Sequence, residues 1–337
     1  MSANTAGSFD GGSFRDRQGR VYLVDGRVIR GLKASALANY EALNQTSFFP
    51  RLLAAGSVIG GRVLDKAEVP LDQEQTAAWD GFLEHDRVAV ISYPYEWTVS
   101  MLQDAALLQL SLLELALDED FTIKDATPYN VQFVDGRPVF IDIPSFEPLT
   151  AGKPWTGYRQ FCELFLFPLL LQCYKGIDFQ PLLRARIDGV DLQQANRLLG
   201  LRDRFRKGVM SHVWLQSKLD SRFSNTSREV KTDLKAAGFN KELILANVRK
   251  LKKLIEGLNW QHGRTEWGNY ADTHNYTETD HKQKGAFVDQ CLAGDRRGLL
   301  WDMGSNQGQF SRIAAQHCDQ VLALDVDHPS LDRLFRE

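Results

Sequence analysis

The feature that most constrains the fold is a stretch late in the sequence, LLWDMGSNQGQFSRIAAQHCDQVLALDVD, at residues 299–327. A short apolar run ends at Asp302, a polar turn carries Gly304 and Gly308, and apolar residues then follow at helical spacing. A second apolar run ends at Asp325. This order predicts a strand, a glycine turn, a helix and a second strand, which is the opening unit of a nucleotide-binding α/β sheet.

The charges in this stretch distinguish between nucleotide ligands. A dinucleotide site needs the pattern G-x-G-x-x-G, because the pyrophosphate sits on bare backbone amides at a helix N-terminus. Here the pattern is D-x-G-x-x-x-G, and Asp302 would repel a pyrophosphate. Asp325, at the end of the second predicted strand, suits a carboxylate that accepts both hydroxyls of a ribose. These features favour S-adenosylmethionine, which has a ribose, an adenine and an ammonium-bearing tail but no phosphate.

The same stretch resembles the first two motifs of class I S-adenosylmethionine-dependent methyltransferases. An aromatic residue before the first strand can face the sulfonium in that family, gaining a cation–π interaction of roughly 0.5–2 kcal/mol, and Tyr276 and Tyr270 are the candidates here. The alternative for the aromatic residue is that it packs at the junction between domains. The alternative for the whole stretch is an ordinary βαβ unit without a ligand. The resemblance implies these further contacts: Asp302, Gly304, Ser305 and Gly308 to the methionine end, Asp325 to the ribose, and Val326 to the adenine.

A second informative stretch covers residues 121–147, FTIKDATPYNVQFVDGRPVFIDIPSFE. Asp125 and Asn130 come first, a hairpin turning at residues 135–136 follows, and Asp142 ends its second strand. The order D-x-x-x-x-N, hairpin, D resembles the catalytic and metal-binding loops of protein kinases and aminoglycoside phosphotransferases. The resemblance implies that Asp125 positions an attacking hydroxyl, while Asn130 and Asp142 hold the magnesium ion of ATP.

The second stretch also departs from the kinase pattern. Kinases have His-Arg before the first Asp and Phe-Gly after the last, whereas this chain has Ile123-Lys124 and Ile143-Pro144. No G-x-G-x-x-G loop lies near the first predicted hairpin, and Lys33 or Arg30 would have to contact phosphate. The stretch is therefore compatible with phosphotransfer, with nucleotide or substrate binding alone, or with a kinase-like scaffold whose chemistry is lost.

Composition limits the other function classes. A hydrophobic content of 43%, a charged content of 25% and a formal net charge of −3 describe an ordinary globular protein with no bulk attraction to nucleic acid or anionic lipid. The four cysteines and the histidines show no metal-ligand spacing, so we expect no metal site in their pattern. The basic stretch at residues 201–208 can be an anion site or a solvated face. We expect a small-molecule or glycan-type substrate and no nucleic-acid partner.

The cysteine pattern indicates reduced thiols and a cytoplasmic protein, and hydropathy predicts no membrane span. The N-terminal residues lack the basic and apolar regions of a secretory signal. The most apolar run, residues 161–173, is too short to span a bilayer and predicts a buried helix. A longer apolar helix is predicted at residues 101–117, after a strand at residues 87–97 and a hairpin around residues 25–26.

Together these features predict an α+β kinase-like N-terminal domain followed by the start of an α/β Rossmann-like methyltransferase domain. The predicted parts are a disordered segment at residues 1–14, the kinase-like domain at 15–223, a linker with an amphipathic helix at 224–258, and the beginning of the methyltransferase domain at 259–337.

The predicted methyltransferase domain is incomplete. A class I sheet has about seven strands within a domain of roughly 200 residues, and this sequence ends after the second. We therefore expect a truncated sequence with its catalytic residues beyond Glu337, and no methyl transfer by these 337 residues alone. Three functions stay open: methyltransferase in the full-length form, kinase-like phosphotransferase or ATP-binding protein, and non-catalytic binding protein.

Overall fold

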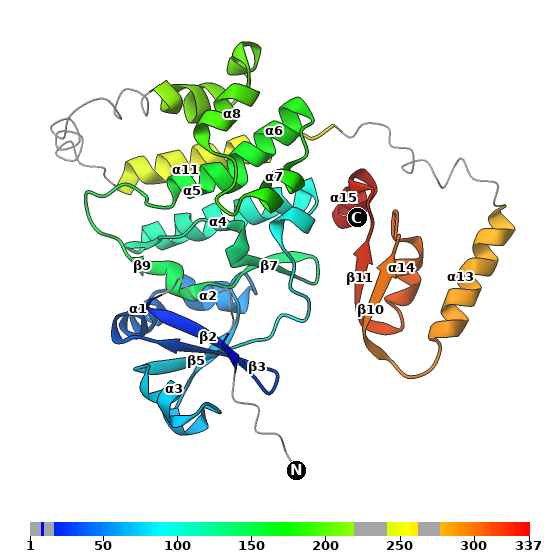
Figure 1. The fold of residues 1–337 in the computed structure, drawn as a ribbon, viewed down its shortest axis with the longest axis horizontal. Coiled ribbons are helices and arrows are strands. Elements are labelled where there is room, and N and C mark those ends of the chain that lie inside the picture. The colour runs from blue at the N-terminus through cyan, green and yellow to red at the C-terminus, as the bar shows by residue number, and fades with distance from the viewer. Residues whose placement is uncertain (1–7, 10–16, 219–240, 262–276) are drawn as a thin grey trace. The chain divides into compact units, whose positions relative to one another are not determined.

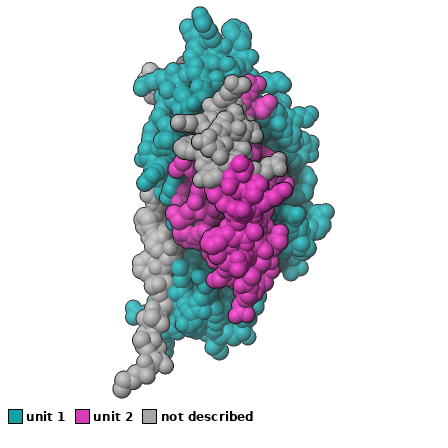
Figure 2. Space-filling model, turned by 90° about the vertical axis from the view of Figure 1, so that its right-hand side faces the viewer, with its two compact units in different colours: residues 1–95, 103–258 teal, residues 96–102, 259–337 magenta. Residues whose placement is uncertain are grey.

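The computed structural model describes residues 8–9, 17–218, 241–261 and 277–337, and has a mixed α/β fold (Figure 1). The chain divides into two compact units, which Figure 2 colours separately. Unit 1 comprises residues 1–95 and 103–258, and unit 2 comprises residues 96–102 and 259–337. The division after residue 258 coincides with the predicted start of the second domain. Each unit is described by itself below.

Unit 1 contains a five-stranded antiparallel sheet in the order β1-β2-β3-β5-β4. The predicted hairpin at Asp25 and Gly26 is confirmed as the β2–β3 connection, and both residues have positive φ, 49° and 77°, as a tight two-residue hairpin turn requires. The strands are β1 (Ser8–Phe9), β2 (Gly19–Val24), β3 (Arg27–Leu32), β4 (Gly61–Leu64) and β5 (Gly81–His85).

Two expectations about this sheet are wrong. Ser8 and Phe9 form β1 by pairing with Leu23 and Tyr22, although residues 1–14 were expected to be disordered. The other residues of that segment lie outside the described residues. The strand expected at residues 87–97 lies earlier, because Gly81–His85 is the segment that pairs with both β3 and β4.

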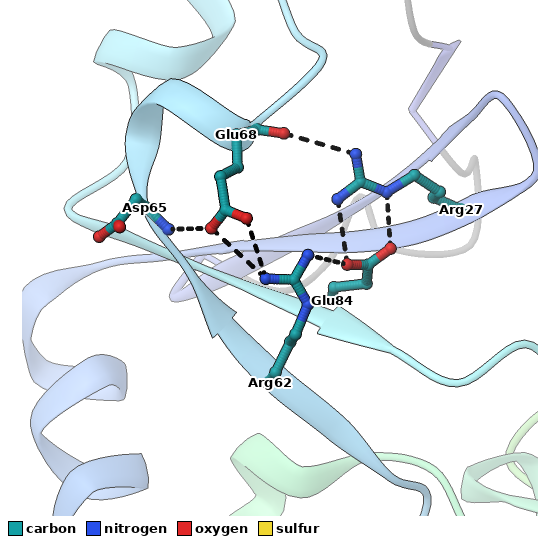
Figure 3. Close-up of polar contacts among 5 residues, drawn as sticks. All are labelled: Arg27, Arg62, Asp65, Glu68 and Glu84. Carbon is teal, nitrogen blue, oxygen red and sulfur yellow. Dashed lines mark hydrogen bonds and ion pairs between the residues drawn. The ribbon is translucent and has the colours of Figure 1, made fainter.

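An ion-pair network covers one face of this sheet (Figure 3). The Arg27 guanidinium donates to both carboxylate oxygens of Glu84, at 2.6 and 3.0 Å. Arg62 on β4 contacts Glu84 at 3.0 Å and Glu68 at 3.1 Å. Glu84 on β5, the strand between β3 and β4, therefore joins its two neighbouring strands, and these hydrogen bonds lower the pKa of Glu84.

The remainder of unit 1 is mainly helical and packs around α4. That helix is buried at Leu110, Leu113, Leu117 and other apolar positions. By length and composition α4 could cross a membrane, but 56% of its most apolar window is buried inside the protein, so it gives no clear indication of a span. The helices of unit 1 are α1 (Ala34–Asn44), α2 (Phe48–Ala54), α3 (Gln73–Ala77), α4 (Val99–Asp118, from Gln103 on), α5 (Tyr158–Phe161), α6 (Phe167–Lys175), α7 (Phe179–Ala185), α8 (Leu192–Leu198) and α11 (Lys241–Glu256).

The predicted buried helix at 161–173 is present, but it is interrupted. Residues Cys162–Leu166 form a π-helical turn between α5 and α6, and all five are buried. A second π-helical turn, η8, covers Met210–Trp214. Single π-helical turns of this kind insert a residue into a helix and redirect the side chains that follow.

The amphipathic helix expected next to the linker packs on unit 1. Val248, Leu251 and Ile255 of α11 are fully buried, and Gln103 of α4 donates to the carbonyl of Ile255 at 2.7 Å. Glu114 of α4 accepts ion pairs from Arg249 and Lys252 at 2.7 and 2.8 Å. This helix is therefore part of unit 1. The rest of the expected linker, residues 224–240, lies outside the described residues.

Unit 2 contains the predicted strand, turn, helix and strand. Strands β10 and β11 pair in parallel, with Asp302 opposite Ala323 and Met303 opposite Leu324. In the described part of the chain no further strand pairs with either of them, and the apolar side chains of Trp301 and Met303 on β10 are 61% and 78% exposed. The elements are α13 (Glu278–Leu292), β10 (Arg297–Met303), α14 (Gln309–Ala314), β11 (Cys318–Leu324) and α15 (His328–Arg336).

Candidate functional sites

The turn between β10 and α14 adopts a conformation that favours glycine. Gly304, Asn306 and Gly308 all have positive φ, at 83°, 50° and 76°. The backbone amides of Gly304 and Ser305 donate to the carbonyl of Leu324 at 2.8 and 3.0 Å. The turn is thereby held against the end of β11, so the two predicted halves of the site lie together.

Asp325 fixes the turn from the neighbouring strand. Its carboxylate accepts the backbone amide of Asn306 at 2.7 Å and that of Asp327 at 2.8 Å. Because β10 and β11 are parallel, both carboxyl ends are at the same edge of the pair. The glycine turn and Asp325 thus lie side by side at that end of the strand pair and together present backbone amides and a carboxylate.

The other predicted residues of this site have different environments. Asp302 accepts a hydrogen bond from Ser311 Oγ at 2.6 Å, which directs its carboxylate toward the start of α14. Ser305 is only 6% exposed, and its hydroxyl has no hydrogen-bond partner in the described residues. Val326 is 88% exposed. Tyr276 and Tyr270 lie outside the described residues.

The predicted acidic site of unit 1 is assembled around Asp142. The guanidinium of Arg30 on β3 forms an ion pair with Asp142 Oδ1 at 2.6 Å. Ser145 Oγ and, at 3.4 Å, Asn130 Nδ2 donate to Oδ2. Burial would raise the pKa of Asp142, but the charge of Arg30 and the hydrogen bonds from Ser145 and Arg30 outweigh it and hold the pKa below its ordinary value.

Asp125 lies beside this cluster on a loop fixed from several sides. Ser145 Oγ is 3.5 Å from Asp125 Oδ2, and so links Asp125 weakly to Asp142. The amide of Ala126 donates to Gln160 at 2.7 Å, which anchors the loop to α5. A cavity of about 600 Å³ adjoins Asp125, and its other lining residues are Lys124, Glu147, Thr156, Arg159, Gln160 and Glu163.

The two basic residues considered for phosphate contact, Lys33 and Arg30, lie in different surroundings. Lys33 donates to the carbonyl of Ala78 and lies over the ring of Trp79, away from the acidic cluster. Arg30, by contrast, forms the ion pair with Asp142. The sequence pattern placed Arg30 on a strand but did not indicate this partner.

Two members of the cluster had no signal at all in the sequence. Ser145 donates to Asp142 and lies 3.5 Å from Asp125, and His85 on β5 is 7% exposed and interacts electrostatically with Arg30 and Asp142. Burial, followed by the charge of Arg30, lowers the pKa of His85 to about 4, so its ring is neutral at pH 7.

The donor set of this cluster fits a magnesium ion only in part. Carboxylate and amide oxygens are suitable ligands, but both oxygens of Asp142 already accept protein donors, one of them a guanidinium. Within the described residues no three His, Cys, Asp or Glu side chains converge as a metal-binding group.

Comparison with known proteins identifies a relative of this chain. No protein-family model matches the chain. Nodulation protein NoeA of Rhizobium meliloti (strain 1021) is 33% identical over 328 residues, which cover 96% of this chain and 67% of the relative. Among solved structures, vaccinia related kinase 3 aligns over 84% of this chain and 87% of its own, at 13% identity and a TM-score of 0.32.

Proposed function

The chain belongs to the family of nodulation protein NoeA, and we propose that its unit 2 binds S-adenosylmethionine as the methyl donor of a methyltransferase. The observation that carries this proposal is the contact between Asp325 and the glycine turn, 2.7 Å from Asn306 N to Asp325 Oδ2. It joins the residues expected at the ribose to those expected at the methionine end. The methyl acceptor is proposed to be a small molecule or a glycan-type compound.

The residues present fit such a ligand. The hydroxyl of Ser305 is buried without a partner, and a buried hydroxyl in that state gains from a ligand atom that accepts or donates a hydrogen bond. A Cβ at Gly304 would meet no atom within 4 Å, so the backbone there is open to close approach. The exposed side chain of Val326 offers an apolar surface to a ring.

Each residue then has a separate part in binding. Ser305 and the amides of the turn would contact the methionine end, and Asp325 would accept the ribose hydroxyls. Asp302, negatively charged, would attract the ammonium group, with Ser311 holding its carboxylate in place. When bound, S-adenosylmethionine supplies an activated methyl group for transfer to a nucleophile. No residue of the described chain is proposed as the catalytic base.

Isothermal titration of the full chain with S-adenosylmethionine tests this proposal. We expect binding that is lost in Asp325→Ala and retained in Asp295→Ala, a matched loss of an exposed acid in the turn before β10. Equal affinity of both variants, or no binding by the unaltered chain, would contradict the proposal.

ATP binding or phosphotransfer by unit 1 is the second candidate. The observation that favours it is the convergence of Asp142, Asn130 and Ser145, with Arg30 placed where a basic residue could meet a phosphate. Asp125, beside the cavity, would then position the attacking hydroxyl of the substrate.

The same titration, made with ATP and magnesium, separates the two candidates. Loss of ATP binding in Asp142→Ala, with retention in the exposed control Asp188→Ala, would support the second. Absence of binding for both ligands would favour the third function, a non-catalytic binding protein in which both sites have lost their ligands.

A further inference from the structure

A surface of unit 1 outside both candidate sites combines clustered cations with exposed apolar side chains. It consists of residues 201–218, which we call the 201–218 surface, and it spans the 3-10 helix η7 (Leu201–Phe205) and the π-helical turn η8. We propose that this surface binds anionic lipid membranes peripherally. Its basic residues are Arg202, Arg204, Arg206, Lys207 and Lys218, and its exposed apolar residues are Leu201, Phe205, Met210 and Leu215.

The charge of this surface is strongly one-sided. Asp203 is the one acidic residue in the sequence 201–218. It is 6% exposed and is paired with Lys175 at 3.1 Å and with Arg206 at 3.4 Å. Its charge is therefore directed inward, and the outward charge of the surface remains positive.

Aromatic rings hold several of these cations in place. Arg204 and Lys218 both lie over the ring of Trp214, at 4.8 and 4.0 Å from its centroid. Arg206 lies over Tyr174, at 4.9 Å. Such cation–π contacts fix long side chains that would otherwise be mobile, so the positive charge is arranged before a ligand arrives.

The exposed apolar side chains give the surface a second property. Phe205 is 91% exposed and Leu201, one turn earlier in η7, is 69% exposed. Met210 and Leu215 on the adjoining helix are 43% and 48% exposed. Four large exposed apolar side chains and five cations thus share the stretch 201–218. This combination of apolar and basic side chains is the composition that interfacial membrane-binding segments have.

A lipid surface fits this composition better than a nucleic acid does. Nucleic-acid sites place open aromatic rings where bases can stack, but Trp214 and Tyr174 are already covered by cations. The apolar groups left free are aliphatic, except for Phe205, and suit acyl chains. Phosphate groups of anionic lipids would face the arginines and lysines.

Cosedimentation of the full chain with vesicles tests the proposal. We expect binding to vesicles that contain phosphatidylglycerol, weakened by high salt, and little binding to vesicles of phosphatidylcholine alone. Arg202→Gln with Lys207→Gln should reduce the partition coefficient roughly 25-fold, about fivefold for each charge. Phe205→Ser should reduce it about tenfold by removing apolar contact.

Matched variants control for total charge and for folding. Arg137→Gln with Lys153→Gln removes one arginine and one lysine that are exposed elsewhere on unit 1, and Ile187→Ser removes an apolar side chain that is 57% exposed. Both should bind vesicles as the unaltered chain does, and thermal unfolding should be the same for all variants. Binding to single-stranded RNA without binding to vesicles, equal loss in the control variants, or no vesicle binding would each overturn the proposal.

Discussion

Arg30 and Asp142 are 112 residues apart in the sequence, and their ion pair of 2.6 Å joins β3 to the segment that follows the β7–β8 hairpin. The hairpin strands are β7 (Val131–Val134) and β8 (Arg137–Phe140). Both side chains are largely withdrawn from water, at 12% and 22% exposure. The pair therefore depends on each partner to compensate for the loss of hydration of the other.

Arg30→Gln should destabilise unit 1 by about 1–3 kcal/mol, because it leaves the Asp142 carboxylate partly buried without its cation. The effect should be seen in urea denaturation at pH 7. The pKa of Asp142 is lowered in the folded protein, so its contribution is present above pH about 4 and is lost as pH falls further. The cost of Arg30→Gln should accordingly shrink in strong acid. A cost that is independent of pH would contradict this assignment.

Ser305→Ala should weaken S-adenosylmethionine binding by about tenfold while leaving the stability of unit 2 almost unchanged. The reason is that the hydroxyl has no partner in the described protein to lose. Ser311→Ala is the contrasting variant, because it removes the 2.6 Å hydrogen bond to Asp302 and should lower stability by about 1 kcal/mol. Titration and hydrogen exchange of the β10–β11 amides measure the two effects separately.

Gly308→Ala should destabilise unit 2 more than Gly304→Ala. Both positions have a φ near 80°, which costs an L-residue about 1–2 kcal/mol. A Cβ at Gly308 would also lie 2.4 Å from a methyl group of Leu334, whereas one at Gly304 would meet nothing within 4 Å. Faster exchange of the α14 amides in the first variant is the expected result, and equal exchange in both would contradict it.

His85 and His212 should make unit 1 less stable in mild acid. Burial, followed by the charge of Arg30 for His85 and of Lys250 for His212, lowers each pKa to about 4. The unfolded chain, with histidine pKa values of about 6.5, binds more protons between these limits. The free energy of unfolding should therefore fall as pH decreases from about 6.5 to 4, by up to about 1.4 kcal/mol per pH unit for each histidine.

Denaturation curves across that pH range test this expectation. His85→Gln should flatten the dependence by the share of one histidine. His212→Gln should flatten it by a similar share, and a pH dependence unchanged in both variants would contradict the assignment.

Leu251→Ala should cost unit 1 about 2–5 kcal/mol, because this α11 side chain is fully buried. Leu243→Ala on the same helix should cost less than about 0.5 kcal/mol, since Leu243 is 58% exposed. Thermal unfolding of the two variants would show whether α11 belongs to the cooperative unit. Equal shifts would mean that the helix is only loosely attached.

Local features of the fold were predictable from the sequence. The hairpin turns at Asp25–Gly26 and Asp135–Gly136 depend on residues that accept positive φ, and the structure has positive φ at all four. The β10–turn–α14–β11 order likewise follows from apolar runs and glycines within a single short stretch.

Long-range features were not predictable. Arg30 and Asp142 come together only because the sheet and the β7–β8 segment fold against one another, and no local pattern encodes that meeting. β1 has two residues, too few for any periodic signal, and its existence depends on pairing with Leu23 and Tyr22. Residues 87–97 have the composition of a strand, but it is Gly81–His85 that pairs with β3 and β4 and forms the strand between them.

The open flank of β10 bears on how this protein behaves at high concentration. Parallel strands are ordinarily enclosed on both faces, yet Trp301 and Met303 are largely in water, and in the described residues β11 is the one strand paired with β10. An unpaired strand edge beside apolar side chains is a template for pairing between molecules. For these 337 residues taken alone, aggregation should therefore begin at residues 297–303, and Met303→Lys is the substitution most suited to improve solubility without altering the buried core.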